Sequence, residues 1–144
     1  MSLDAAVQAL VDAGAEFVII GGWCGILHGS RFMTDDLDIC FSRNRENLRC
    51  LARAFAPYHP RRRDVPGTIF TLDTDLGGID LLAEVSGLGT FDDIKAASIA
   101  VEAFGRRVRT LDLRSLIKAK RAAGREKDLR ALPELESLLE AEEP

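Results

Sequence analysis

The spacing of apolar residues predicts short helices and strands in alternation at the start of the chain. Apolar residues recur at helical spacing up to Gly14, which predicts a first helix of about ten residues that ends at this glycine. Phe17–Ile20 is a continuous apolar run between glycines, which is typical of a strand buried on both faces. A short helix is expected over residues 23–27.

The next segment predicts a strand that carries two carboxylates on one face. Residues 36–41 alternate between polar and apolar side chains. Because successive side chains of a strand point to opposite faces, Asp36 and Asp38 share a face. Asp35 then points to the other side and is left out of the pair.

The remaining pattern completes a mixed α/β (α+β) domain. Strands are predicted at residues 68–72, 79–83, 99–104 and 107–110, the first two forming a hairpin through 73–78. Helices are predicted at residues 47–55, 113–123 and about 127–139, with Gly124 and Pro133 interrupting the last two. Residues 57–67 form the one expected long loop. Within the hairpin, Asp80 projects away from the face of Ile79 and Leu81.

Length and composition indicate one folded domain. The chain has 144 residues, of which 47% are hydrophobic and 29% charged, which excludes disordered and fibrous proteins. We expect a single domain over residues 1–144, with a core of about 1–110 and C-terminal helices of about 111–140. No apolar run approaches the ~20 residues that cross a bilayer, so no membrane partner is expected. Three widely spaced cysteines and no sign of a secretory signal favour a cytoplasmic protein.

The net charge of −4 hides an acidic and a basic region. Residues 1–41 hold six acidic residues and one basic residue, whereas residues 106–130 hold ten basic and three acidic residues. Most charge runs are solvated helix faces. The more specific interpretation is that a polyanion binds between cations held by the acidic region and the Lys and Arg side chains of the basic region. Phosphates bind both metal ions and Lys or Arg.

A glycine pair precedes the aspartates and indicates a phosphate site. Gly21 and Gly22 follow the first strand, where glycines let the backbone approach a ligand closely. A helix that opens there supplies unpaired N–H groups, which favour phosphate. Ser30, Arg31 and Thr34 then lead into the carboxylates.

Asp36 and Asp38 require a cation. No lysine lies near them in sequence, and like charges held side by side cost stability unless a divalent cation joins them. Mg²⁺ prefers one or two protein carboxylates together with phosphate oxygens of a substrate. Asp80 reaches the same metal if its strand lies beside that of Asp38.

In these residues the chain resembles the polymerase-β-type nucleotidyltransferase superfamily in its minimal form. The family pattern is a glycine pair after the first strand, an arginine followed by Thr-x-Asp-x-Asp, and a third aspartate on a later strand. The matching positions are Gly21, Gly22, Arg31, Thr34, Asp36, Asp38 and Asp80. The most similar subgroup is that of the AbiEii-type toxin nucleotidyltransferases, whose later Lys and Arg-x-Lys-Asp match Lys118 and residues 125–128.

The resemblance implies both a fold and an activity. The fold is the nucleotidyltransferase fold, a mixed central β-sheet flanked by helices with a short C-terminal helical segment. The activity is Mg²⁺- or Mn²⁺-dependent transfer of NMP from an NTP to an acceptor hydroxyl, with release of pyrophosphate. Asp36, Asp38 and Asp80 are then the catalytic and metal-binding residues. The implied nucleotide-binding residues are Gly21, Gly22, Ser30, Arg31, Thr34, Lys118 and Arg125.

The acceptor and the partners stay open at this point. The acceptor is a tRNA, a protein or a small molecule, and the resemblance implies a cognate antitoxin as a partner. Because longer relatives have a large C-terminal helical domain, a partner chain or a homodimer is a further way to recognise the acceptor. The alternative is a non-catalytic nucleotide- or protein-binding module that retains the fold, although such a module has no need of three aspartates.

Other polar residues have structural interpretations. Asp73 and Asp75 lie in turn-like sequence, and His28 is expected to cap or pack. Cys24 and Cys40 are expected to fill the core. A ligand role is preferred for Lys118 and Arg125 over a solvated rim, with Lys127 and Asp128 as an ion pair. The arginines at 61–63 fit a nucleic-acid contact or an exposed loop about equally.

Overall fold

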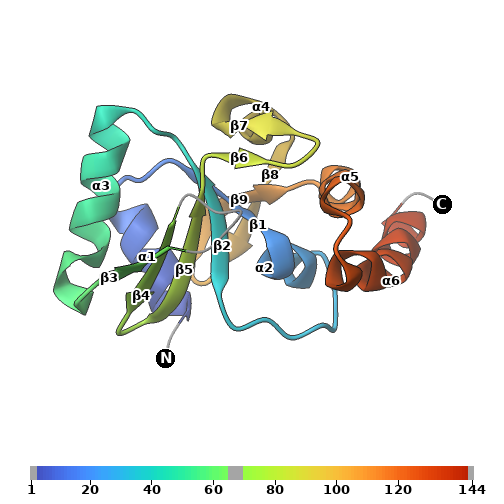
Figure 1. The fold of residues 1–144 in the computed structure, drawn as a ribbon, viewed down its shortest axis with the longest axis horizontal. Helices are drawn as coiled ribbons and strands as arrows, with labels where there is room; N and C mark the ends of the chain where they lie inside the picture. The colour runs from blue at the N-terminus through green and yellow to red at the C-terminus, as the bar shows by residue number, and fades with distance from the viewer. Residues whose placement is uncertain (1–2, 65–69, 143–144) are drawn as a thin grey trace.

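In the described part of the chain, seven strands form one mixed sheet, and helices lie on both of its sides (Figure 1). The computed structural model describes residues 3–64 and 70–142. The strand order is β3-β4-β5-β2-β1-β9-β8, and a separate two-stranded sheet pairs β6 with β7. In Figure 1, α1 and α3 lie to the left of β2, whereas α2, α5 and α6 lie to its right.

The strands and helices are short. The strands are β1 (Phe17–Ile20), β2 (Leu37–Phe41), β3 (Arg61–Arg63), β4 (Phe70–Thr74), β5 (Gly77–Leu82), β6 (Glu84–Val85), β7 (Gly89–Thr90), β8 (Ser98–Ala103) and β9 (Arg106–Leu111). The α-helices are α1 (Leu3–Asp12), α2 (Gly21–Leu27), α3 (Arg45–Phe55), α4 (Phe91–Ala96), α5 (Leu113–Ala123) and α6 (Glu126–Glu142), and Ala56–Tyr58 forms the 3₁₀ turn η1.

The elements with a strong hydrophobic pattern are confirmed. Strand β1 and helix α5 have the predicted bounds, and α1 ends just before Gly14, whose φ of 76° is the left-handed conformation that favours glycine. The hairpin of β4 and β5 is also confirmed, although residues 68 and 69 of the predicted strand lie outside the described residues. Mixed α and β structure around one central sheet is therefore the observed fold class.

Several predicted boundaries were wrong by a few residues, and residues 61–63 of the predicted loop form β3. Pro133 does not interrupt the last helix, because α6 continues through it to Glu142. A proline inside a helix costs one hydrogen bond, and burial of Leu135 on the following turn offsets that loss. The link between β4 and β5 is also shorter than predicted, because both strands extend to a tight turn between Thr74 and Gly77. The short elements β3, β6, β7 and α4 gave too little periodicity to predict.

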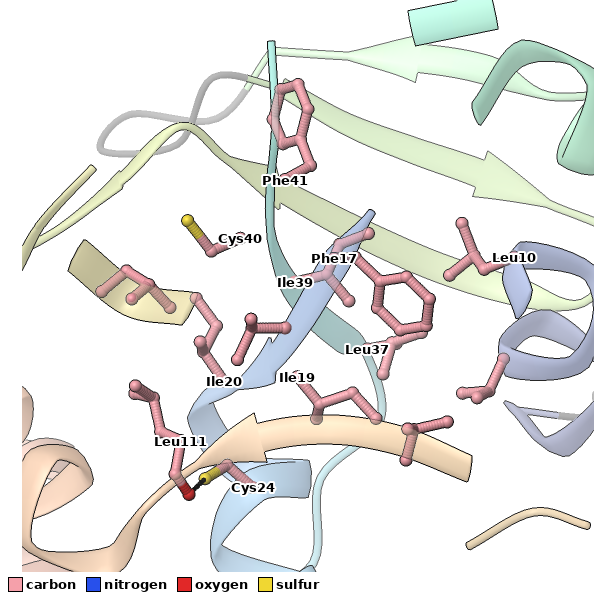
Figure 2. Packing of buried hydrophobic residues seen from close by; sticks show 14 of the residues in the cluster. Leu10, Phe17, Ile19, Ile20, Cys24, Leu37, Ile39, Cys40, Phe41 and Leu111 are labelled. Atoms are coloured by element: carbon pink, nitrogen blue, oxygen red, sulfur yellow. Dashed lines mark hydrogen bonds between the residues drawn. The ribbon is translucent and has the colours of Figure 1, made fainter. Parts of the chain in front are cut away.

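The core lies on both faces of β1, the strand between β2 and β9. All four residues of β1 are buried, with Ile19 among the largest side chains that are fully enclosed. Figure 2 shows Ile19 and Ile39 packed together, with Leu10 approaching from α1. The Cys24 thiol donates to the Leu111 carbonyl oxygen at 3.3 Å, which links α2 to the end of β9. This packing fixes the end of β1, where the candidate site begins.

The strand directions bring the predicted site residues to one part of the sheet. β1 and β2 are antiparallel, so the end of β1 lies beside the start of β2, with Ile20 in register with Asp38. β2 and β5 are parallel, and β5 and β4 are antiparallel. The glycines after β1 and the aspartates of β2 and β5 are therefore neighbours in space.

Candidate functional site

Asp38 and Asp80 lie opposite each other on neighbouring strands. They are in register on the parallel strands β2 and β5, and Thr71 of β4 is in register with Asp80. The hydroxyl of Thr71, which is fully buried, donates to Asp80 Oδ1 at 2.5 Å. Because paired positions share a face of the sheet, the two carboxylates and the hydroxyl form a row across three strands.

Asp36 lies beside this row, above a glycine. It directly precedes β2, and Gly78 is the neighbouring position on β5. A Cβ atom at Gly78 would lie 2.5 Å from Asp36 Oδ1, well inside van der Waals contact. The missing side chain at Gly78 therefore provides the space that the Asp36 carboxylate occupies.

Gly21 and Gly22 form the opposite wall of the site. Gly21 has a φ of 64°, and a Cβ there would collide with the Asp38 carboxylate. A Cβ at Gly22 would lie 2.8 Å from the Thr34 side chain. Gly21 is thus required both by its backbone conformation and by its contact with Asp38. The backbone at the start of α2 lies directly against the carboxylate as a result.

The carboxyl groups of Asp36 and Asp38 hold their protons more tightly than isolated aspartates do. Burial and the neighbouring carboxyl group of Asp80 raise the pKa of Asp38 to about 7. Burial and the charge of Asp80 also raise the pKa of Asp36. A cation that binds Asp38 below this pKa has to displace its proton.

Cationic side chains act on the carboxylates from opposite sides, Lys127 and Arg125 from the α6 side and Arg63 from β3. The pKa of Arg125 is raised mainly by its hydrogen bond with Asp128 and in part by the charge of Asp38. Lys127 of α6 is the basic residue whose charge lowers the pKa of Asp38. Arg63 of β3 acts in the same way on Asp36, and the charges of Asp36 and Asp80 in turn contribute to the raised pKa of Arg63. The main partner of Arg63 is Asp73, which accepts from its Nε and Nη2 at 2.9 and 3.1 Å.

The loop before the aspartates is held by α6. Glu134 accepts a hydrogen bond from Ser30 Oγ at 2.5 Å and one from the backbone N–H of Arg31 at 3.0 Å. Both hydrogen bonds lower the pKa of Glu134, and the bond from Ser30 has the larger effect. Ser30 is therefore directed at Glu134 in this structure, whereas Arg31 is exposed. Thr34 packs over Gly22.

The predicted cations of the C-terminal helices occupy different positions. The Lys118 side chain is exposed on α5 and takes part in no side-chain hydrogen bond or ion pair among the residues that the structure describes. α5 ends at Gly124, and Arg125 follows in the link to α6, so the two side chains do not share a helix face. Arg125 Nε donates to Asp128 at 2.7 Å, and Lys120 Nζ lies 3.4 Å from the same buried carboxylate. The predicted ion pair of Asp128 with Lys127 was wrong.

The residues interpreted as structural have structural partners. His28 Nε2 donates to the Leu111 carbonyl oxygen at 2.7 Å. Asp73 pairs with Arg63, and Asp75 lies 2.6 Å from His59 Nδ1. All three cysteines are free and buried. Among the described helices, none combines the length and the apolar character needed to cross a membrane.

The donor set at Asp38 and Asp80 fits a divalent cation. Mg²⁺ binds through one or two protein carboxylates and completes its shell with water and phosphate oxygens. Asp38 and Asp80 are in register on neighbouring strands, and Asp36 directly precedes β2, two residues before Asp38. Within residues 3–64 and 70–142, no group of three or more His, Cys, Asp or Glu side chains is arranged around one metal position. The joint use of all three aspartates stays a prediction.

Solved structures with the same architecture identify the fold. A Thermotoga maritima protein proposed to be a nucleotidyltransferase has a TM-score of 0.61 and 17% identity, over 93% of this chain and 94% of that one. ANT(2″)-Ia, in complex with adenylyl-2″-tobramycin, has a TM-score of 0.62 and 17% identity, over 95% and 92% of the two chains. This chain has the nucleotidyltransferase fold.

A third structure extends the comparison to a fungal protein. An antigenic nucleotidyltransferase-like protein from Paracoccidioides brasiliensis has a TM-score of 0.56 and 15% identity, over 94% of this chain and 77% of that one. No family model matches the sequence, and no curated protein does. At 15–17% identity, these similarities establish the fold of the chain. Its chemistry has to be argued from the residues of the site.

Sequence reasoning missed four residues that contact or face the site. They are Thr71, Gly78, Lys127 and Glu134. Thr71 was accessible to pattern analysis, because a two-residue turn at Asp75 and Leu76 would have set its register with Asp80. The contact of Glu134 with Ser30 joins residues 104 positions apart, and no local pattern predicts such a contact.

Proposed function

We propose that the protein is a divalent-metal-dependent nucleotidyltransferase that transfers NMP from an NTP to the hydroxyl group of an acceptor. The observation that carries the proposal is the register of Asp38 with Asp80 on parallel strands, directly beside the backbone of Gly21. Two carboxylates opposite each other in a partly buried site form a typical cation site. The solved structure of ANT(2″)-Ia with an adenylylated product, on the same fold, supports this assignment.

The proposed reaction exchanges one phosphorus–oxygen bond for another. The acceptor oxygen bonds to the α-phosphorus, the bond from that phosphorus to the oxygen bridging to the β-phosphate breaks, and pyrophosphate leaves. Asp80, oriented by Thr71, accepts the proton of the acceptor hydroxyl. Mg²⁺ held by Asp36, Asp38 and Asp80 would supply positive charge to the phosphate oxygens. No covalent intermediate on the protein is required.

The nucleotide is proposed to bind on the α2 side of the carboxylates. Gly21 and Gly22 admit the triphosphate close to the backbone, because neither has a side chain in the way. Arg31 and Lys118 are both exposed and supply positive charge from the loop and from α5. Lys127, whose charge already acts on Asp38, is a third cation for the phosphates.

Label transfer tests the proposal directly. The protein is incubated with Mg²⁺ or Mn²⁺ and each α-labelled NTP, and total tRNA, a protein lysate and small hydroxyl acceptors are offered separately. We expect label on one acceptor class and stoichiometric pyrophosphate, both absent in Asp38→Asn and Asp80→Asn. Nucleotide binding without transfer to any acceptor would instead favour the non-catalytic module.

The toxin role is the finer part of the proposal and rests on the later motif. Lys118, Arg125 and Lys127 of that motif lie on or between the two C-terminal helices, which pack on each other. Expression of the wild-type chain in bacteria is expected to arrest growth, whereas the Asp38→Asn variant is not. An adjacent gene that restores growth would identify the cognate antitoxin.

A further inference from the structure

Two arginines of the edge strand β3 extend the row of carboxylates. β3 pairs with β4 so that Arg63 lies opposite Thr71 and Arg61 opposite Asp73. Read across the sheet, one row consists of Asp38, Asp80, Thr71 and Arg63. The adjacent row consists of Asp36, Gly78, Asp73 and Arg61. Each row therefore begins at an aspartate of the candidate site and ends at an arginine.

The arginine between them points to the other face. Arg62 lies opposite Leu72, and its guanidinium stands 4.9 Å from the ring centroid of Phe70. Its Nε donates to Asp64. Because side chains alternate along a strand, only Arg61 and Arg63 share the face of the carboxylates. Arg62 is therefore a matched control, because it is the same residue type, directly between the two in sequence, on the opposite face of the strand.

Arg61 and Arg63 retain donors for a ligand. The bidentate bond to Asp73 uses Nε and Nη2 of Arg63 and leaves its Nη1 group, while the side chain remains 52% exposed. The Arg61 side chain is exposed and, among the described residues, takes part in no side-chain hydrogen bond or ion pair, although its charge acts on Asp73. The two hydrogen bonds to Asp73 fix the direction of the Arg63 guanidinium, on the strand position opposite Thr71.

The position of β3 assigns these donors to the acceptor side. The glycines proposed to receive the nucleotide lie on the β1 side of the carboxylates, and β4 and β3 lie on the other side, with β3 at the edge of the sheet (Figure 1). With strands ~4.8 Å apart, β3 lies about 10 Å from β5 and its Asp80. A long arginine side chain reaches a group next to a hydroxyl that is held at Asp80.

We infer that the acceptor carries a phosphate or phosphodiester group next to its reacting hydroxyl, and that Arg61 and Arg63 bind this group. The inference rests on the proposed nucleotidyl transfer and names its acceptor class. Guanidinium groups match phosphate oxygens through paired N–H donors. Two arginines at alternate positions of a strand are ~6.6 Å apart and offer two successive contacts along an extended chain of phosphodiesters.

The same arginines disfavour an amine-rich acceptor. An acceptor with several ammonium groups is positively charged, and Arg61 and Arg63 repel it from this side of the carboxylates. A free nucleotide and the end of an RNA chain present the same phosphate chemistry, and they differ in how many phosphates they offer.

Binding measurements test the inference without requiring transfer. A short labelled single-stranded RNA and AMP are titrated against the full chain, the double variant Arg61→Gln/Arg63→Gln and the control Arg62→Gln. We expect the double variant to lose RNA affinity and to lower the slope of log affinity against log salt by about 0.7 for each lost phosphate contact. Arg62→Gln should match the wild type. A wild-type affinity for AMP equal to that for RNA would identify a single phosphate as the recognised group.

A second variant acts in the opposite direction. Asp73→Asn removes the carboxylate that occupies Arg63, so RNA affinity should rise. Arg61→Lys/Arg63→Lys should keep, through charge alone, part of the RNA affinity that the double glutamine variant loses. Equal RNA affinity in the double glutamine variant and in Arg62→Gln would overturn the inference. So would a loss of NTP affinity in place of RNA affinity, because the arginines would then serve the nucleotide.

Transfer assays separate this inference from the proposed function. If the wild type labels an acceptor that lacks phosphate, and the double glutamine variant labels it equally well, the inference fails and the transfer activity stands. If RNA binds through Arg61 and Arg63 but no acceptor is labelled under any condition, the proposed transfer fails. A rise in KM for RNA at unchanged KM for NTP in the double variant supports both.

Discussion

Gly78 and Asp36 are neighbours across β5 and the start of β2, and a Cβ at residue 78 would lie 2.5 Å from Asp36 Oδ1. The backbone of Gly78 lies in an ordinary strand and outside the left-handed region, so its conformation suits any residue. The contact with the carboxylate alone requires glycine at this position. Such a requirement links a strand residue without a functional group to the geometry of the site.

Replacement of Gly78 by alanine should therefore impair the site and spare the fold. The added methyl group displaces the Asp36 carboxylate, and a misplacement of ~1 Å in a catalytic group costs about 10²-fold in rate. Label transfer and urea unfolding are measured together. Gly25→Ala is the control, because its Cβ would make only ordinary contacts, the nearest at 3.5 Å from Ser30. Full transfer activity in Gly78→Ala would show that Asp36 is not needed in its present position.

Asp38 should make the folded protein less stable as the pH rises through neutrality. Its pKa is about 7 in the folded chain, against ~3.9 for an unfolded aspartate. Between these values the folded state retains a proton that the unfolded state has released, so the free energy of unfolding falls with rising pH. Asp38→Asn removes this dependence and should be more stable than the wild type at pH 8, by on the order of 2 kcal/mol.

Urea unfolding at a series of pH values checks this sign. The two proteins should have the same stability near pH 4 and diverge between pH 4 and 8. Asp35→Asn serves as the control, because Asp35 is exposed and adjacent in sequence. A wild-type stability that rises over this range, with Asp38→Asn below it, would mean that Asp38 is stabilised as a carboxylate.

The periodic elements of this fold were predictable because local burial alone determines them. Phe17–Ile20 is apolar at every position since both faces of β1 are covered, and Asp36 and Asp38 alternate with Leu37 and Ile39 because one face of β2 packs into the core. These patterns need no knowledge of distant residues. They predicted strands that carry all three aspartates. The structure places Asp38 and Asp80 in register on β2 and β5, and Asp36 directly before β2.

The surroundings of the aspartates depended on contacts that local sequence does not encode. A motif favoured Lys118 as the cation of the site. In the structure, Lys127 of α6 is instead the lysine whose charge lowers the pKa of Asp38. That outcome depends on how α6 turns back after Gly124, which Asp128 fixes by accepting from Arg125 and Lys120. The partner of Ser30 likewise depends on how α6 packs, and neither contact leaves a periodic signal.

Asp128 should be important for stability rather than for chemistry. Its carboxylate is 1% exposed, and it bonds Arg125 and Lys120 where α5 meets α6. Asp128→Ala removes charge-assisted hydrogen bonds from a buried position and should lower the free energy of unfolding by about 2 kcal/mol. Glu136→Ala, which breaks the exposed pair with Arg121, should cost about 0–1 kcal/mol. Equal effects of the two substitutions would show that the buried pair does not hold α6 in place.

Mg²⁺ together with the correct NTP should raise the melting temperature of the wild type and leave that of Asp38→Asn unchanged. A ligand that binds only the folded state stabilises it by about 2.7 kcal/mol at ~100 Kd, which corresponds to roughly 8 °C for a domain of this size. Because the metal must displace the proton that Asp38 holds below its pKa of about 7, the shift should be larger at pH 8 than at pH 6. Calorimetry with each NTP, with and without Mg²⁺, measures this, and EDTA should reverse it. A shift that persists in Asp38→Asn, or that has the same size at both pH values, would place the cation away from these carboxylates.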